Sequence, residues 1–293
     1  MPKDSERASR ASRGVLFMLF SALCYAGSGA TIRALTDHFS PYQLALIRAV
    51  LGTLVLLPWL LRHGASALRT ERLGLYAVRA VAVYSGNLCW FYALAHLHLA
   101  DATALSFLAP LFGVVVVAFW LGESLGPMRI AALLLGVVGA LVIVRPGFQP
   151  VGLAVLAALY VVVAYGTVTA LIRGLALTEN ANAIVFYQFA LHVPLALGPG
   201  IWHWQPIGVG ELPWVLAFGV LSFLAQYFMT RSLACAEAAV VMPTYYLQLP
   251  LVALLGFALF DQVPNWWLLP GALLIVGGSY VSVWSESRAT REA

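Results

Sequence analysis

The stretch VYSGNLCWFYALAHLHLADATALSFLAPLFGVVVVAFWLGE, residues 83–123, decides the fold. It contains two long apolar segments joined by a short polar turn, and Pro110 interrupts the second segment near its middle. A proline removes one hydrogen bond of the helix backbone, and lipid tolerates such a gap only where the bend packs on a neighbour or lines a cavity. The stretch therefore predicts two membrane-spanning helices, the second of them bent beside a cavity or another helix.

The same plan returns later in the chain. Residues 219–262 read GVLSFLAQYFMTRSLACAEAAVVMPTYYLQLPLVALLGFALFDQ, and Pro250 stands where Pro110 stood. We interpret the two stretches as the walls of a central site, with Pro110 and Pro250 as its hinges.

The composition is that of an integral membrane protein. Hydrophobic residues make up 62% of the 293 positions and charged residues only 10%, where a soluble domain has roughly 25% charged residues. The net charge is +4, but the basic residues lie between apolar runs, so they indicate orientation in a bilayer and no nucleic-acid partner. Cys24, Cys89 and Cys235 each lie within an apolar run, which favours small buried hydrophobes over disulfides or metal ligands.

The apolar runs predict an all-α membrane protein with ten transmembrane helices. A window of about 20 apolar residues spans a bilayer as a helix. Ten such windows lie near residues 14–35, 41–62, 72–96, 100–121, 127–145, 150–174, 182–203, 212–234, 237–260 and 265–285. They divide the chain into a tail (1–13), two five-helix repeats (14–145 and 150–285) and a second tail (286–293).

The basic residues predict the orientation. With the amino terminus in the cytoplasm, twelve of the 16 Lys and Arg residues fall inside: Lys3, Arg7, Arg10, Arg13, Arg62, Arg69, Arg72, Arg129, Arg173, Arg231, Arg288 and Arg291. The positive-inside rule then puts both termini in the cytoplasm. We expect the protein to lie in the plasma membrane, which in bacteria is the inner membrane. Six tryptophans fit an interfacial belt: Trp59, Trp202, Trp204, Trp214, Trp266 and Trp267.

The two halves share landmarks at a separation of 139 or 140 residues. Residues 32–35 (IRAL) return as 172–175 (IRGL), Leu94-Ala95 as Leu233-Ala234, Pro110 as Pro250, and Gly139 as Gly278. Because five helices is an odd number, the second half must enter the membrane from the opposite face. Two inverted repeats with a site between them near mid-membrane, and alternating access, are typical of secondary transporters.

The chain also resembles a known family. The ten-helix doubled plan, the segment LAPLFGVVVVAFWLGESL (108–125) with Gly122-Glu123, and the glycine-spaced LLLGVVGALVIV (133–144) resemble the EamA-type branch of the drug/metabolite transporters. The aromatic third and eighth helices make the chain most similar to the YddG-type amino-acid exporters. This resemblance implies export of amino acids or similar small metabolites. The second half departs from the pattern with Asp261-Gln262, and we expect Glu123 to be structural.

The third and eighth helices supply the first candidate substrate-binding residues. Tyr84, Asn87, Leu88 and Phe91 share one helical face, and the offset of 139 maps them in this order onto Phe223, Gln226, Tyr227 and Thr230. An unpaired amide in hydrocarbon is costly, so Asn87 and Gln226 should face protein or a wet cavity. Two interpretations stay open, namely hydrogen bonds between helices and contact with the substrate.

Further candidates lie on the other helices. Tyr25 and Tyr165 are an equivalent pair at an offset of 140, and either binding or packing explains them. Ser106 precedes Pro110, while Tyr246 and Gln248 precede Pro250, and polar groups beside a proline can satisfy the carbonyl that it frees. We expect these side chains to line the cavity.

Three basic side chains fall inside predicted helices. Arg48 and Arg79 lie seven residues into their helices, where each could reach the headgroups by snorkelling or could bind a carboxylate. His192 falls near the middle of the seventh helix and could carry a proton, but a neutral, hydrogen-bonded histidine is the simpler interpretation.

Several kinds of chemistry find no support in the sequence. The acidic residues Asp101, Glu123, Glu237 and Asp261 fall at helix ends, so the usual carboxylate proton relay is absent at mid-membrane. The chain lacks a P-loop and the HExxH and GxSxG motifs. We therefore expect that the protein is not an enzyme and has no catalytic residue and no cofactor. We also expect no metal site, because His96 and His98 lie in a predicted exposed turn.

These observations predict a secondary transporter that exports amino acids, aromatic ones included, and related neutral or zwitterionic metabolites. Lacking a buried acid, it could run as a uniporter down the gradient of its solute. Within the same class, the alternatives are a sugar-phosphate or nucleotide-sugar exchanger, which needs a basic cavity, and a multidrug exporter. Outside the class, the alternative is a membrane assembly factor that transports nothing.

Overall fold

The computed structural model is a bundle of helices, and all regular secondary structure among its described residues is helical. The structure describes residues 4–64, 68, 70–109, 111–113, 115–116, 127–145, 152–176, 179, 181–236, 241 and 244–292. The first half contains α1 (Asp4–Leu35), α2 (Pro41–His63), α3 (Leu73–His96), α4 (Leu99–Ser106) and α6 (Pro127–Val144). The second half contains α7 (Leu153–Ala176), α8 (Ala181–Ala190), α9 (His192–Trp202), α10 (Leu212–Cys235), α12 (Gln248–Phe260) and α13 (Leu268–Glu292).

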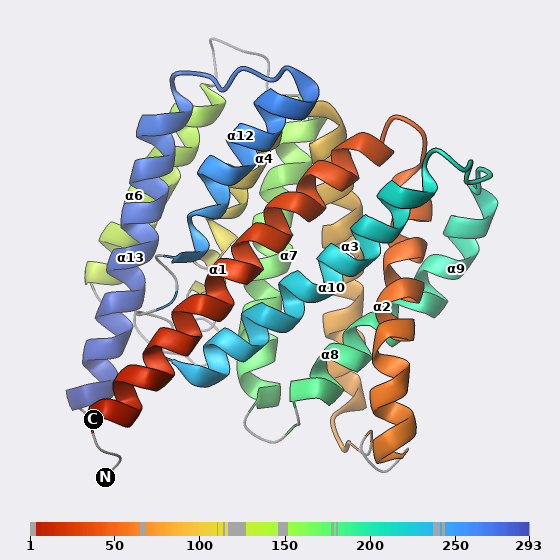
Figure 1. Cartoon of the computed structure of the whole chain (residues 1–293). Helices are drawn as coiled ribbons and strands as arrows, with labels where there is room; N and C mark the ends of the chain where they lie inside the picture. Colours follow the sequence, from red (N-terminus) through yellow and green to blue (C-terminus); the bar gives the residue numbers. More distant parts are fainter. Residues whose placement is uncertain are drawn as a thin grey trace.

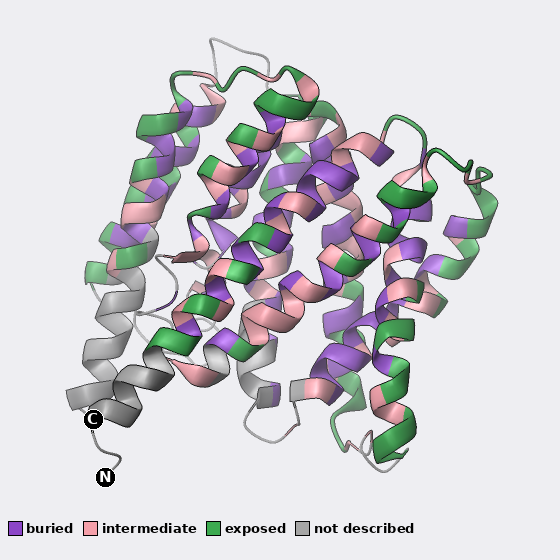
Figure 2. Cartoon of the chain, viewed as in Figure 1, coloured by how far each residue is buried: buried purple, intermediate pink, exposed green. Residues whose placement is uncertain are grey.

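Four segments are long and apolar enough to cross a membrane: Ser12–Leu35, Pro41–His63, Asn182–Trp202 and Leu212–Ser232. Shorter apolar helices include Ile130–Val144, Leu153–Val168, Gln248–Phe260 and Leu268–Gly278. Among the described residues, therefore, helices occur in each of the ten expected windows, but the count of ten membrane crossings stays a prediction. Large apolar side chains are exposed on the outer faces of the bundle, for example Leu61 on α2 and Leu273 on α13, as Figure 2 shows for these helices.

Local sequence signals explain where the helices begin and bend. The Ser40 hydroxyl accepts a hydrogen bond from the backbone N–H of Gln43 at 3.2 Å, and Pro41 follows in the first helical turn of α2. The seventh predicted helix is divided into α8 and α9 at Leu191. Pro194 lies in the first turn of α9 and cannot donate to the carbonyl of Ala190, so the break falls where the proline removes a hydrogen bond.

The packing of the helices is nearly unchanged when the two halves exchange places. Equivalent elements are α1 and α7, α2 and α8–α9, α3 and α10, α4 and α12, and α6 and α13. Helix α1 packs on α10 as α7 packs on α3, α1 packs on α12 as α7 packs on α4, and α2 packs on α10 as α8 and α9 pack on α3. The pairs α6–α13, α4–α12 and α2–α9 each join an element to its own equivalent.

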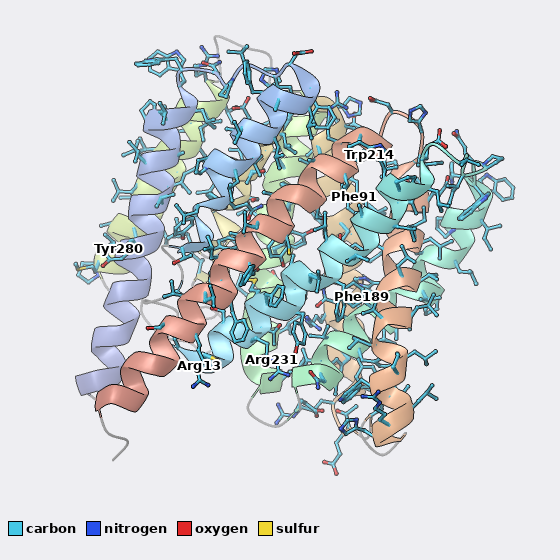
Figure 3. The ribbon with its side chains drawn as sticks, in the orientation of Figure 1. Arg13, Phe91, Phe189, Trp214, Arg231 and Tyr280 are labelled. Carbon is cyan, nitrogen blue, oxygen red and sulfur yellow. The ribbon has the colours of Figure 1, made fainter. Side chains whose placement is uncertain are left out.

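Equivalent helices run in opposite directions along the bundle. In Figure 1, α1 rises from the end where both chain termini lie, whereas α7 descends towards that end, and α2 descends where α8 and α9 rise. Figure 3 places Arg13 and Arg231 at this same end and Trp214 at the other. The two halves of the described chain are thus antiparallel in space.

Small residues allow the closest helix approaches. A Cβ atom added to Gly139 on α6 would lie 2.6 Å from the carbonyl oxygen of Gly271, and one added to Gly278 on α13 would lie 2.6 Å from that of Ala132. Gly139 and Gly278 are equivalent positions, so the same contact is made from both halves. On the other side, serine hydroxyls join α1 to α10: Ser21 donates to the carbonyl of Ala225 at 2.8 Å, and the hydroxyls of Ser28 and Ser222 are 2.8 Å apart.

Candidate functional site

Two tyrosines reach from one half of the chain to an amide in the other. The Tyr25 hydroxyl on α1 donates to Gln226 Oε1 on α10 at 3.0 Å, and the Tyr165 hydroxyl on α7 donates to Asn87 Oδ1 on α3 at 2.8 Å. Tyr25 is equivalent to Tyr165, and Asn87 to Gln226. The two hydrogen bonds are therefore one interaction made twice, and the amides do form the hydrogen bonds between helices that the sequence left open.

Glycine and aromatic neighbours position these tyrosines. Gly86 precedes Asn87, and a Cβ atom there would lie 2.9 Å from Cε1 of Tyr165, so the missing side chain lets the Tyr165 ring approach α3. The Tyr25 ring packs edge-on against Tyr245 with a centroid distance of 6.0 Å. Asn87 is buried and Gln226 is half-buried.

Helices α4 and α12 are interrupted at equivalent positions beside this site. The chain turns at residues 107–108 after α4 and at residues 246–247 before α12. Pro250 has no N–H for the carbonyl of Tyr246, which instead accepts from the N–H of Leu249 at 3.1 Å. Pro250 lies in the first turn of α12, while Pro110 lies outside the described residues.

An aromatic cluster fills the space between the two interruptions. Phe107 lies 5.7 Å from Tyr245 and 5.0 Å from Tyr246 between ring centroids, and Tyr245 lies 6.1 Å from Tyr246. Since the Tyr25 ring also contacts Tyr245, the cluster joins α1, α4 and α12. The equivalents of Tyr245 and Tyr246 in the first half are Leu105 and Ser106, so this part of the site is asymmetric.

Arg48 on α2 belongs to the same centre. Its guanidinium lies over the ring of Phe189, 5.5 Å from the centroid. It is also close enough to act electrostatically on both Tyr25 and Tyr165, and Tyr245 is similarly close to these two tyrosines. Figure 3 shows Phe189 in the interior between α10 and α2. The guanidinium is thus half-buried and packs on a buried ring of α8.

Arg79 and His192 are both buried, each 2% exposed. Arg79 donates to the carbonyl of Ile184 at 3.2 Å and to Gln188 Oε1 at 2.6 Å, so it ties α3 to α8 and does not snorkel. His192 begins α9, and one ring nitrogen meets the backbone of Ala80. Its Nε2 atom is buried and has no hydrogen-bond partner among the described residues.

The other predicted site residues take varied positions. Tyr84 lies 6.3 Å from His192 between ring centroids, and its buried hydroxyl has no partner within the described part of the chain. Gln248 begins α12, is 5% exposed, and its Oε1 likewise has no described partner. Phe91, which is labelled in Figure 3, is buried edge-on against Phe218 with a centroid distance of 5.9 Å. Ser106 donates to the carbonyl of Thr103 at 2.7 Å.

Phe223 and Tyr227 lie in a second aromatic cluster. Their rings stack at 5.9 Å, and Phe223 lies 6.2 Å from Phe189, which joins this cluster to Arg48. The Tyr227 hydroxyl accepts a hydrogen bond from Nε of Arg231 at 3.2 Å. The two aromatic residues therefore connect the centre with the end of the bundle where Arg231 lies.

Sequence reasoning did not select Phe107 and Tyr245, and it left open whether Arg48 snorkels or binds a carboxylate. Tyr245 adjoins Tyr246 in the sequence, but the internal repeat gives it no aromatic equivalent. The depth of Arg48 in its helix is the same as that of Arg79, so depth alone does not separate their environments.

A surface cavity of about 370 Å³ lies away from this centre, at the end of the bundle opposite the termini. It is lined by the turn between α1 and α2 and by Tyr92, His96 and Gln205. Among the described residues, no group of three or more His, Cys, Asp or Glu side chains could hold a metal ion.

The model of the EamA-like transporter family matches this chain twice, over residues 12–145 and 152–284. Among solved structures, one crystal structure covers 98% of this chain and 99% of its own, with 23% identity and a TM-score of 0.63. At that identity the likeness shows a shared fold.

The chain is similar over nearly its whole length to several curated transporters. It is 32% identical to the pseudopaline exporter of Pseudomonas aeruginosa, covering 90% of this chain and 93% of the relative. It is 29% identical to the riboflavin transporter of Vibrio cholerae, with 96% of each chain covered. It is 22% identical to the S-adenosylmethionine uptake transporter of Rickettsia felis, with 94% of each covered. None of these three relatives is named as an amino-acid exporter.

Proposed function

The chain belongs to the EamA-like transporter family, and on this premise we propose that it exports amino acids, including aromatic ones, and related small metabolites as a secondary transporter. The family is one of multi-pass membrane transporters and not of enzymes. The proposal places this chain in a bacterial inner membrane, with both termini in the cytoplasm and ten helices crossing the bilayer.

The observation that carries the proposal is the pair of tyrosine–amide hydrogen bonds across the two halves. Tyr25 bonds to Gln226 and Tyr165 to Asn87, and both Arg48 and Tyr245 lie within electrostatic range of the two tyrosines. A polar centre between two antiparallel repeats is where secondary transporters of this architecture bind their solute. Rocking of the repeats would exchange these hydrogen bonds for contacts with the solute.

The chemistry of the centre supports an amphipathic solute with an aromatic or apolar part. Phe107, Tyr245 and Tyr246 offer ring faces and edges, and such surfaces bind flat or apolar groups by stacking and dispersion. Riboflavin and S-adenosylmethionine, which relatives are named for, both contain aromatic rings. The amides of Asn87 and Gln226, together with Gln248, supply polar contacts for the rest of such a solute.

The distribution of acids supports a uniporter. Among the described residues, the acidic side chains whose positions are given lie in loops or near helix ends: Asp37, Glu71, Asp101, Glu179, Glu211 and Asp261. A proton relay through the membrane ordinarily uses a carboxylate at mid-depth. We therefore expect efflux to follow the gradient of the solute itself.

The test is a flux screen in reconstituted vesicles with the full chain. The twenty amino acids and riboflavin are offered one at a time, with and without a pH gradient, and the variants Gln226→Ala and Tyr246→Ala are compared with the wild type. We expect flux of aromatic amino acids that is insensitive to the pH gradient and reduced about tenfold in both variants, the equivalent of one lost polar or ring contact.

Arg62→Gln, an exposed position on α2, is the control and should leave flux unchanged. Flux of riboflavin alone would move the substrate class away from amino acids. Unchanged flux in Gln226→Ala and Tyr246→Ala would remove the proposed site, and no flux of any solute would remove the function.

A further inference from the structure

Arg48 and Arg79 differ in how many of their N–H groups find acceptors in the protein: Arg79 makes two hydrogen bonds and only its Nε lacks a partner among the described residues, whereas the structure gives Arg48 none. Arg79 donates to the carbonyl of Ile184 and to Gln188 Oε1, which accounts for both ends of its guanidinium fork. Its burial at 2% exposure and these neutral partners fit a structural link between α3 and α8. The hydrogen bonds of Arg79 therefore show what a structural arginine looks like in this protein, and the surroundings of Arg48 can be compared with them.

Arg48 is left without an acceptor. Its Nη1 atom is buried and has no hydrogen-bond partner among the described residues. The ion pairs found in the described part of the chain lie elsewhere, between Arg33 and Asp37 and between His98 and Asp101. A guanidinium keeps its charge under ordinary conditions, and the half-buried charge of Arg48 has no counter-ion among the described residues, so an acidic group placed beside it would be stabilised.

The surroundings of Arg48 hold the charge in place without neutralising it. The face of the Phe189 ring supports the guanidinium at 5.5 Å. Gly52, one turn further along α2, leaves the space for that ring, because a Cβ atom at Gly52 would collide with Phe189. Phe189 is fully buried. Gly52 on α2 and Phe189 on α8 thus together provide the surface on which the guanidinium packs.

The groups around that guanidinium are two neutral hydroxyls, which donate to Gln226 and Asn87, and a buried histidine. The hydroxyls of Tyr25 and Tyr165 lie within electrostatic reach of Arg48. On another side, His192 is within reach of the same charge, is 2% exposed and has an unpartnered Nε2. No described carboxylate makes an ion pair with any of these groups. Such a site is complementary to an anion and not to a cation.

We propose that Arg48 binds an acidic group of the transported solute, a carboxylate or a phosphate, and that the aromatic cluster holds the rest of the solute. The inference rests on the proposed transport function and narrows its substrate class to solutes that carry an acid. The planar guanidinium can give two parallel N–H bonds to a carboxylate or phosphate, which an ammonium cannot do.

The experiment compares matched pairs of solutes that differ in the acidic group. One pair is L-tryptophan and L-tryptophanamide, and the other is riboflavin and riboflavin 5′-phosphate. Binding of each to the purified full chain is measured at equilibrium for the wild type, Arg48→Gln, Arg48→Lys and the control Arg62→Gln. The first pair tests a carboxylate and the second a phosphate.

We expect the wild type and Arg62→Gln to bind the acidic member of at least one pair about tenfold more tightly than the partner that lacks the acid. In Arg48→Gln the two members should bind alike. Arg48→Lys should keep only part of the preference, because it keeps the charge without the fork. If Arg48→Gln does not fold, a preference in Arg48→Lys equal to that of the wild type decides against the role of Arg48.

Equal binding of acidic and neutral members by the wild type in both pairs, or a preference that survives in Arg48→Gln, would overturn the proposal. Flux in vesicles is recorded separately for the same solutes. Transport of a neutral solute without any preference for its acidic partner would leave the transport function standing and remove only the acid-binding site.

Discussion

At the scale of single residues, the hydrogen bonds of Tyr25 and Tyr165 show that each half of the chain donates one tyrosine hydrogen bond to the other half. Each tyrosine donates to an amide of the other half, at 3.0 and 2.8 Å. Such a bond contributes modestly to stability, but an amide left buried without a partner costs more than the bond itself contributes. The cost should therefore be larger where the acceptor is more buried, at Asn87.

Tyr165→Phe is expected to lower the free energy of unfolding by about 1 to 3 kcal/mol, because buried Asn87 loses its donor. Tyr25→Phe should cost less, since Gln226 is half-buried. The measurement is denaturation of the purified chain in detergent. Tyr160→Phe is the matched control on α7, where the exposed hydroxyl lies 2.9 Å from that of Ser85, which also donates to the carbonyl of Ala82. Equal losses in Tyr160→Phe and Tyr165→Phe would contradict the argument.

The sequence predicted the members of these pairs but not how they pair. The internal offset picks out Tyr25, Asn87, Tyr165 and Gln226, because equivalent positions in a repeat carry similar groups. Which tyrosine meets which amide depends on how α1 packs on α10 and α7 on α3, and that packing depends on all the helices together. For the same reason the sequence could not separate the partnered Arg79 from Arg48.

At the scale of elements, the interruptions before α12 and after α4 are the features that distinguish these helices from simple spans. Helix breaks fall at residues 107–108 and 246–247, two to three residues before position 110 and three to four before position 250. The sequence predicted the bends from Pro110 and Pro250 because the loss of an N–H is a local property. The aromatic filling by Phe107 and Tyr245 is a tertiary property and was not predicted.

Pro250→Ala would restore an N–H that can bond to the carbonyl of Tyr246 and extend α12 backwards. We expect unchanged or raised thermal stability and flux lowered several-fold, because the break would be harder to deform. Pro213→Ala is the control, since this proline lies in the first turn of α10 where its missing N–H removes no helical bond. Normal flux in Pro250→Ala would show that the hinge has no role in transport.

The contact of α6 with α13 provides a second test at this scale. Gly278→Ala should lower the free energy of unfolding by about 1 to 3 kcal/mol, because the new Cβ atom would press on the carbonyl of Ala132. Gly277→Ala is the control next to it, where nothing lies within 4 Å, and it should be neutral or slightly stabilising. Equal effects of the two substitutions on chemical denaturation would mean that α6 and α13 do not pack as described.

At the scale of the whole molecule, the main feature is the pseudo-twofold relation between the two halves. The same helix contacts are made in both directions, and equivalent helices run antiparallel. The sequence predicted this plan because the parity of helix number fixes the direction of the second repeat. We propose that the centre where these halves meet is a chamber that opens to the two sides of the membrane in turn.

The most direct test of that claim is the reactivity of a single thiol at the centre. In a background with Cys24, Cys89 and Cys235 replaced by alanine, Asn87→Cys is treated with a membrane-impermeant maleimide from each side of oriented vesicles. Ala93→Cys, on the same helix but fully buried in the core, is the control and should stay unlabelled. We expect the thiol at position 87 to react from both sides and to be protected by the transported solute. A thiol at position 87 as unreactive from both sides as the one at position 93 would contradict it.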